Sequence, residues 1–401
     1  MVLPVAWGLL AALALVLSWV TGTASFAWVG YAMVGVWVLA IAAARLGQRG
    51  ITVRRTLSAD CLAFGGRVRV DVVVANSSRL PILWLSAAEA LPAGLPMRGV
   101  RGWIGYLGGR SEQRFSYTLV GARRGYHQLG PTAVRTGDLF GLATRHAEGG
   151  GRSYLTVFPR IVPIQHGRFP SRRPAGEVRA RPRVLEDPTL VVGIRPYQRG
   201  DGLRRVHWRA TAHTGRLQSK LFEITAQIET TLILNLRRAD YAVSPEQASD
   251  ASELAIVTAA SIARHVLDRR QRIGLIALAR DPAGDAADDL VRVRPGRAGD
   301  QLVALLSVLG RAALSRGDSL GDVIRREKEG LAWGSLVIVI TPAVDDQALS
   351  ALLGLRTSGF EVSVVLVGKG AQLPADAAGL AAIGIRAWRV ASEADIRELG
   401  I

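Results

Sequence analysis

The apolar and polar positions of the chain follow three successive patterns. Two long uncharged runs, 3–20 and 26–44, come first and are joined by the short connector TGTAS. Over 51–164, short segments such as RVRVDVVVANSS at 67–78 alternate apolar and polar residues, and this period of two favours β-strands. Over 228–401, apolar runs of strand length alternate with stretches of helical periodicity. Three structurally different regions are therefore expected.

The two uncharged runs predict a transmembrane hairpin over residues 1–50. At about 1.5 Å per helical residue, the run 26–44 is roughly 28 Å long, close to the ~30 Å hydrocarbon core of a bilayer. Trp19 and Trp28 flank the connector, where an aromatic belt at the membrane surface is expected. The alternative is a cleaved signal peptide. Such a peptide begins with basic residues, whereas this chain begins with MVLP, and a second apolar run follows at once.

Basic residues after the second run predict the orientation of the hairpin. Arg45, Arg49, Arg54 and Arg55 follow it directly, and basic flanks remain on the cytoplasmic side of a membrane. We therefore expect a protein of the cell membrane with two spans, whose termini and soluble domains are all cytoplasmic. The lipid bilayer itself is then one expected partner.

Beyond the hairpin, four segments are predicted. Short strands separated by glycine make 51–164 an antiparallel β-sandwich-like domain. Residues 165–190 are interpreted as a basic linker because Arg, Pro and Gly dominate most of them. Residues 191–227 hold a dense cluster of aromatic and charged residues. The β-α-β-α-β order of 228–401 predicts a doubly wound α/β domain with a parallel sheet. No strand there is followed by GxxxxGK or GxGxxG, so the sequence supports no nucleotide site.

Composition narrows the classes of function. The formal charge is +17, and all but three of the 50 basic residues are arginine. Such a balance fits a polyanion-binding protein, but it also fits the codon bias of a GC-rich genome, and we favour the second explanation. No RRM-, KH- or OB-like motif is recognisable, so nucleic acid is not an expected partner. With Cys61 as the only cysteine, an intrachain disulfide and a Cys-rich zinc cluster are excluded.

The densest group of candidate functional residues is YQRGDGLRRVHWRATAHTGRLQSK at 197–220. His207 and His213 are candidate general bases. The motif offers no clear nucleophile, because no serine precedes Ser219 within it, and an isolated His–Asp pair is a weak catalytic signal. We expect no catalytic residue in this segment.

Two non-catalytic interpretations of the motif stay open. In the structural one, Asp201 accepts a two-bonded contact from Arg204 or Arg205, and Tyr197 and Trp208 fill the space between the two soluble domains. In the other, the same residues form a surface that docks a partner protein. Both interpretations require a mutually satisfied set of polar and aromatic groups, so the sequence does not separate them.

Ten spaced residues between positions 197 and 223 make up the motif. These are Tyr197, Gly200, Asp201, Arg204, His207, Trp208, Leu217, Lys220, Phe222 and Glu223. Their order resembles the signature of the domain-of-unknown-function-58 (DUF58) family, whose members are bacterial and archaeal membrane proteins. The upstream elements ARRGYHQLGP, GDLFGL and FPR resemble the β-domain of that family, so the resemblance covers essentially the whole chain.

The resemblance implies a fold, partners and a kind of function. It implies that the last domain is von Willebrand factor A-like and that a MoxR-type AAA+ ATPase is the partner, with other membrane proteins of the same system. No enzymatic activity follows from it. We therefore expect a membrane-anchored, non-catalytic scaffold or adaptor that acts by protein–protein docking. The alternative is a subunit of a cell-envelope enzyme system, followed by a polyanion-binding membrane protein.

The sequence departs from the family where a metal would bind. Von Willebrand factor A domains hold a cation through Asp-x-Ser-x-Ser after the first strand, and here Asn235, Arg237 and Ala239 stand at those positions. His213 stands where many members have arginine, and Thr225 stands where a second acid often follows Glu223. Because arginine repels a divalent cation, which prefers anionic oxygen ligands, we expect neither a metal nor another cofactor.

Overall fold

The computed structural model describes residues 2–138, 141–165, 186–198, 201–224, 229–241, 244–284, 289–297, 299–368 and 373–400. The chain divides into two compact units. Unit 1 consists of Met1–Ile161 with Ala279–Val291 and Val303–Ser315, and unit 2 consists of Val162–Leu278, Arg292–Leu302 and Arg316–Ile401. Unit 1 therefore includes two segments that the sequence assigns to the last domain.

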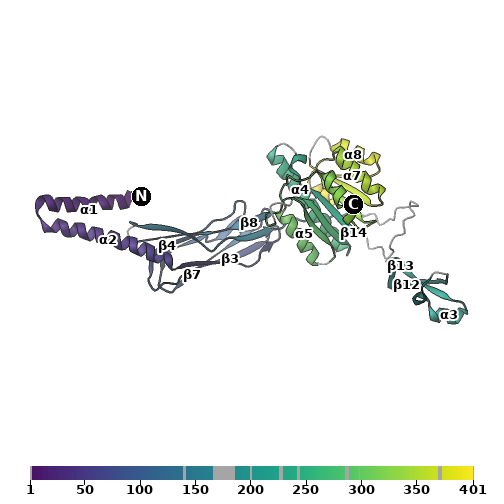
Figure 1. Cartoon of the computed structure of the whole chain (residues 1–401), viewed down its shortest axis with the longest axis horizontal. Helices are drawn as coiled ribbons and strands as arrows, with labels where there is room; N and C mark the ends of the chain where they lie inside the picture. The colour runs from purple at the N-terminus through teal and green to yellow at the C-terminus, as the bar shows by residue number, and fades with distance from the viewer. Residues whose placement is uncertain are drawn as a thin grey trace. The chain divides into compact units, whose positions relative to one another are not determined.

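Two long helices open unit 1, α1 (Val2–Thr21) and α2 (Ala24–Arg49) (Figure 1). Both are long and apolar enough to cross a membrane, a property that signal sequences share. Small residues permit close packing of such helices, and the buried alanines here are Ala11, Ala14, Ala40 and Ala44. The indole of Trp7 also donates a hydrogen bond to the carbonyl of Met33 at 3.0 Å. The hairpin predicted for this region is thus present as a pair of packed helices.

The β-rich part of unit 1 contains eleven strands among the residues described. They are β1 (Ile51–Leu57), β2 (Cys61–Leu62), β3 (Arg67–Asn76), β4 (Ile82–Glu89), β5 (Met97–Gly99), β6 (Gly102–Leu107), β7 (Glu112–Val120), β8 (Gly125–Leu129), β9 (Thr132–Gly137), β10 (Thr144–Gly149) and β11 (Ser153–Val157). Their orders in three sheets are β1-β3-β7-β5, β10-β9-β4-β6 and β2-β11-β8. Neighbouring strands are antiparallel except β2 and β11, which are parallel.

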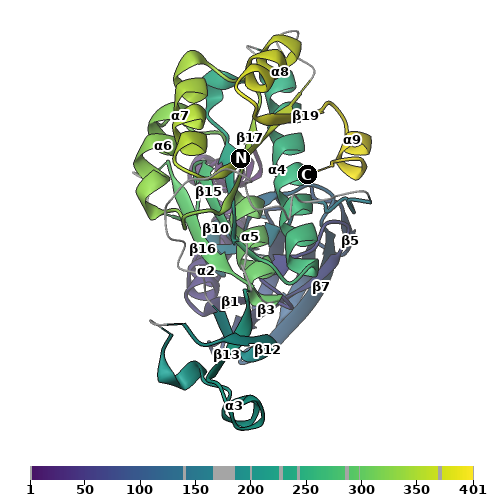
Figure 2. The same cartoon turned by 90° about the vertical axis from the view of Figure 1, so that its right-hand side faces the viewer.

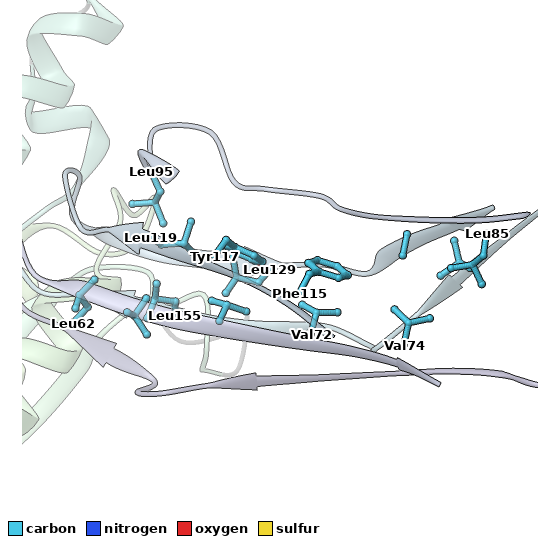
Figure 3. Close-up of a cluster of buried hydrophobic side chains, with 14 of the residues drawn as sticks. Leu62, Val72, Val74, Leu85, Leu95, Phe115, Tyr117, Leu119, Leu129 and Leu155 are labelled. Atoms are coloured by element: carbon cyan, nitrogen blue, oxygen red, sulfur yellow. The ribbon is translucent and has the colours of Figure 1, made fainter. Parts of the chain in front are cut away.

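One apolar core is shared by these three sheets (Figure 3). Strand β3 shows how the sequence builds it, because Val68, Val70, Val72 and Val74 are buried while the residues between them are not. This follows from the alternation of side chains along a strand. Leu85 of β4, Tyr117 of β7 and Leu155 of β11 enter the same core from other strands. The β-rich region predicted for 51–164 is confirmed.

Arg55, one of the basic residues that follow the second apolar run, has a structural role in unit 1. Its side chain lies in β1 with no solvent exposure and pairs with the equally buried carboxylate of Glu89. A charge beside the hydrocarbon core would remain in water, whereas this charge is neutralised inside the β-rich region. Arg45 and Arg49, in contrast, are exposed at the end of α2.

Arg124 joins the β-rich region to the added segments of unit 1. Its Nη1 donates to the carbonyls of Leu309, Gly310 and Ala312 at 3.0, 3.1 and 2.8 Å. These carbonyls lie at the end of α5 (Gly299–Arg311), where a helix leaves its last carbonyls without partners and its dipole attracts a cation. Arg124 belongs to the ARRGYHQLGP element noted in the sequence, and this contact gives that element a structural role.

Unit 2 contains a six-stranded sheet with the order β16-β15-β14-β17-β18-β19. The pairs β14–β15, β14–β17, β17–β18 and β18–β19 are parallel. The bounds are β14 (Glu229–Asn235), β15 (Arg272–Leu278), β16 (Val291–Gly296), β17 (Leu336–Thr341), β18 (Glu361–Val367) and β19 (Arg386–Val390). Every residue of β17 is buried, as expected for a strand covered on both faces.

Helices lie along this sheet as the alternating pattern of the sequence predicts. They are α4 (Pro245–Asp268), α6 (Leu320–Glu327), α7 (Asp346–Thr357), α8 (Leu373–Ala382) and α9 (Glu393–Arg397), in addition to α5. Figure 2 shows α4 on one side of the sheet and the pair α6 and α7 on the other. The predicted linker 165–190 falls mostly outside the described residues, and β12 (Glu186–Pro196) begins within its last five residues.

Candidate functional site

The motif segment of unit 2 folds as two antiparallel strands with a short helix between them (Figure 1). Strand β12 pairs with β13 (Gln218–Ile224), and the connection contains the 3-10 turn Leu203–Arg205 and helix α3 (Trp208–Thr214). A β-bridge between Val206 and Ser219, both buried, fastens the connection to β13. The segment therefore has its own hydrogen-bonded framework.

Asp201 organises the loop that enters the connection. Its Oδ1 accepts from Nη2 of Arg195 at 2.6 Å, and its Oδ2 accepts from the amide of Gln198 at 3.0 Å. The hydroxyl of Tyr197 donates to the carbonyl of Asp201 at 2.9 Å. The hydrogen bond from Arg195, followed by the one from Gln198, lowers the pKa of the Asp201 carboxyl. The loop around this carboxylate thus favours its ionised form.

The geometry adds a partner of Asp201 that the sequence did not suggest. The sequence pointed to Arg204 or Arg205, and the side chain of Arg204 lies outside the described residues; a hydrogen-bonded ion pair is formed with Arg195. Arg195 precedes the motif and comes from β12, so the contact ties the strand to the loop. Arg205 contributes a weaker electrostatic attraction.

His207 begins helix α3. Its Nδ1 accepts a hydrogen bond from the amide of Ala210 at 3.1 Å, which is the contact of an N-terminal capping residue. Gly215 ends the helix with φ +67°, a left-handed conformation that glycine adopts readily. One ring nitrogen of this candidate base is therefore engaged in holding the backbone.

The side chains on the connection are largely turned to solvent. Helix α3 buries none of its residues. Trp208 is 64% exposed, Leu203 69% and Leu217 45%. Arg209, His213 and Arg216 are exposed as well. The motif therefore exposes the apolar side chains of Leu203, Trp208 and Leu217 together with basic residues.

Of the other motif positions, one is described in full and the rest lie wholly or partly outside the described residues. Lys220 lies in β13 opposite Ile194 and is half-buried. Gly200 lies outside the described residues, and the side chains of Arg204 and Glu223 do as well. The structure thus joins Tyr197 to Asp201 in one loop and places His207 at the start of α3.

The tip of strand β14 is occupied by a network of its own. Nδ2 of Asn235 donates to Oδ2 of Asp240 at 2.8 Å and to the hydroxyl of Thr341 at 3.1 Å. The amide of Arg237 donates to Oδ1 of Asn235 at 3.0 Å, and its Nη1 pairs with Oδ1 of Asp240 at 2.9 Å. Ala239 is exposed and offers no polar side chain.

These residues do not fit the cation that the fold family implies. A divalent cation needs several oxygen ligands, preferably anionic, and the one carboxylate in this network already pairs with the guanidinium of Arg237. Within the described part of the chain, no three His, Cys, Asp or Glu side chains are grouped as metal ligands.

Sequence reasoning missed the partners in both networks. Arg195 stands two residues before Tyr197, and Asp240 stands one residue beyond Ala239, so both fall just outside the spaced motifs. An acidic residue three positions after Arg237 is the only signal that the sequence offers, and it is weak because such pairs are common.

Comparisons with known proteins agree with the motif. The family model described as "Protein of unknown function DUF58" matches residues 193–341. "Uncharacterized protein YeaD" of Bacillus subtilis (strain 168) is 23% identical over 328 residues, which are 79% of this chain and 76% of that protein.

Solved structures show more distant likenesses. A von Willebrand factor type A protein from Catenulispora acidiphila is 11% identical, with a TM-score of 0.31, over 45% of this chain and 42% of that one. A CARDB domain from Pyrococcus furiosus is 13% identical, with a TM-score of 0.21, over 27% of this chain and 86% of that one. The resemblance to the DUF58 family that the motif predicts is confirmed by the family match over residues 193–341.

Proposed function

We propose that this protein is a membrane-anchored, non-catalytic adaptor and that its segment β12–α3–β13 docks a partner protein. In this proposal α1 and α2 cross the membrane and keep the soluble domains on the cytoplasmic side. The α/β part of unit 2 is a von Willebrand factor A-type scaffold whose cation site is replaced by the Arg237–Asp240 pair.

The observation that supports docking best is the exposure of Trp208. Burying a tryptophan side chain contributes a large apolar area, and tryptophan is enriched among the residues that dominate binding energy. Here the ring is 64% exposed on a helix that buries none of its residues. Such a helix obtains little stability from its own chain, and a partner that covers it would supply the missing burial.

The charges beside Trp208 indicate the chemistry of the partner. Arg209 and Arg216 are exposed on the same connection, whereas Asp201 is already neutralised by Arg195. A complementary surface therefore has an apolar pocket with an acidic rim. We propose a MoxR-type AAA+ ATPase as this partner on the strength of the family resemblance.

The test is co-purification of the full chain from detergent-solubilised membranes, with bound proteins identified by mass spectrometry. We expect an AAA+ ATPase in the wild-type sample and its loss in Trp208→Ala, while the melting temperature stays unchanged. Trp333→Ala is the matched control, because this tryptophan is 54% exposed elsewhere in unit 2. Equal recovery of the ATPase from wild type and Trp208→Ala, or no recovery of an ATPase from any sample, contradicts the proposal.

A further inference from the structure

The last turn of α2 is fastened to the loops at one end of the β-rich region. The carbonyl of Gly50 accepts from both the amide and the hydroxyl of Ser77, at 2.8 and 2.9 Å. The α-carbon of Gly47 faces Ile82, the first residue of β4, so closely that an added Cβ would lie 3.5 Å from its side chain. This end of the β-rich region is therefore held at a fixed distance along the helix.

Buried Asn76 ties the same loops together. Its Nδ2 donates to the carbonyls of Leu80 and Gly108 at 2.8 and 2.9 Å. The amide of Arg110 donates to the carbonyl of Ser78 at 2.8 Å. The loops 77–81 and 108–111 thus form one rigid end surface beside the helix terminus.

The length of α2 places this end surface at the level of lipid headgroups, provided that the hairpin spans the membrane as proposed above. About 20 residues cross a hydrocarbon core of ~30 Å, and the uncharged run of α2 ends just before Arg45. Gly47 and Gly50 lie two and five residues further, or roughly 3 to 8 Å along the axis. The headgroup layer adds about 5 to 7 Å on each side of the core, so the attached loops fall within it.

The side chains on this surface suit that depth. Leu80 is 53% exposed and Tyr106, one residue before the end of β6, is 60% exposed. Arg45, Arg49, Arg79 and Arg110 are exposed, and within the described part of the chain none of them has an ion-pair partner. The nearby carboxylate of Glu112 already pairs with Arg114. Exposed apolar and aromatic groups among unpaired cations are what an anionic membrane surface attracts.

We propose that this surface, made of Arg45, Arg49, Arg79, Leu80, Tyr106 and Arg110, binds the headgroups of anionic phospholipids. The arginines contact phosphate groups, while Leu80 and Tyr106 enter the boundary between headgroups and acyl chains. The β-rich region is then seated on the bilayer in a defined orientation instead of being held by the helix alone.

The test uses the full chain in lipid nanodiscs, with Cys61→Ser as the background for single labelling sites. An environment-sensitive fluorophore is attached at Leu80→Cys or, as a matched control, at Phe64→Cys. Phe64 is 44% exposed and lies near the start of β3, while Asn76 ends that strand, roughly 30 Å away. Lipids with a quencher near the headgroup report the depth of each label.

We expect severalfold stronger quenching at position 80 than at position 64. It should be stronger with phosphatidylglycerol than with phosphatidylcholine alone. Arg79→Glu with Arg110→Glu should remove the dependence on phosphatidylglycerol, and Arg67→Glu, an exposed arginine at the far end of β3, should leave it intact. Equal quenching at both positions, or the same quenching at position 80 in both lipids, overturns the inference.

The result is separable from the docking proposal. A chain that enters nanodiscs but shows no quenching at position 80 contradicts the lipid surface alone, and loss of ATPase recovery is measured independently through Trp208. A chain that does not enter nanodiscs contradicts both the membrane anchor and the lipid surface.

Discussion

The guanidinium of Arg55 and the carboxylate of Glu89 form a two-bonded ion pair inside the β-rich region. Nε and Nη2 of Arg55 each lie 3.0 Å from an oxygen of Glu89, and neither side chain has any solvent exposure. The hydroxyl of Tyr117 also donates to Glu89, and burial, followed by the charge of Glu89, raises the pKa of this tyrosine. Nη1 of Arg55 donates to the carbonyls of Leu129 and Gly151. The pair therefore joins five parts of the chain that are far apart in sequence.

Breaking this pair should destabilise the protein strongly. Glu89→Ala leaves a buried guanidinium without its counter-charge, and we expect the free energy of unfolding to fall by about 3–5 kcal/mol. The double replacement Arg55→Met with Glu89→Leu removes both charges and should cost less. Chemical denaturation of the purified chain in detergent measures both. A double variant that is less stable than Glu89→Ala would contradict the account.

Arg124 should stabilise the end of α5 in a way that lysine or alanine does not. A single nitrogen of its guanidinium, Nη1, donates hydrogen bonds to three carbonyls. Hydrogen bonds to charged groups contribute about 1.5–3 kcal/mol. We expect Arg124→Ala to lower the free energy of unfolding by roughly this amount. Arg123→Ala is the control, because the neighbouring side chain is exposed and its loss should stay within about 0.5 kcal/mol. Similar losses in both variants would refute the capping role.

The loop around Asp201 should respond to pH through a lowered pKa. Because Arg195 and the amide of Gln198 favour the carboxylate, the folded pKa lies below the ordinary value of about 3.9. The stabilisation is then present above that ordinary value and is lost as the pH falls through the lowered folded pKa. Titration of the Asp201 carboxyl carbon by NMR measures this, with Asp201→Asn to assign the signal.

Removing the hydrogen bond from Arg195 tests whether it causes the lowered pKa of Asp201. In Arg195→Ala the strongest donor is gone, so the pKa of Asp201 should move upward toward the ordinary value. An unchanged pKa in Arg195→Ala would show that the ion pair does not control the loop.

Divalent cations should not stabilise the native chain through the tip of β14. The guanidinium of Arg237 already neutralises Asp240 there. We expect added Mg²⁺ to leave the melting temperature unchanged, and to raise it in the triple variant Asn235→Asp, Arg237→Ser and Ala239→Ser, which introduces the Asp-x-Ser-x-Ser pattern of von Willebrand factor A domains. Binding at 100 times the dissociation constant stabilises by about 2.7 kcal/mol. The control is the double variant Arg237→Ser with Ala239→Ser, which keeps Asn235. A rise in the melting temperature of the native chain on addition of Mg²⁺ would contradict the prediction.

Much of the fold was predictable, because the spacing of apolar residues along the chain indicates which side chains are buried. The alternation at 67–78 is the buried valine row of β3, and the uncharged runs are α1 and α2. The apolar run SLVIVITP contains β17, which is buried throughout. Local patterns of this kind depend only on neighbouring residues, so a single sequence reveals them.

The hydrogen-bonded networks were not predictable, because their partners are not close neighbours in the sequence. Arg55 follows an apolar run and gives no local sign of a buried ion pair, because its partner Glu89 is 34 residues away. Asp201 pairs with Arg195, which belongs to β12 and lies outside the spaced motif. Choosing among many arginines requires knowledge of which strands are paired, and composition makes the choice harder because arginine is so frequent.

Only Gly50 separates the end of α2 from the start of β1, and two hydrogen bonds from Ser77 brace that joint. Because the connection is so short, a change in the direction of α2 would change the direction of β1. Helices that are longer than the local hydrocarbon thickness tilt to fit it, and a tilt of α2 would re-aim the first strand and every strand hydrogen-bonded to it. In a hairpin that spans the membrane as proposed, bilayer thickness would in this way influence how the end surface of the β-rich region meets the headgroups.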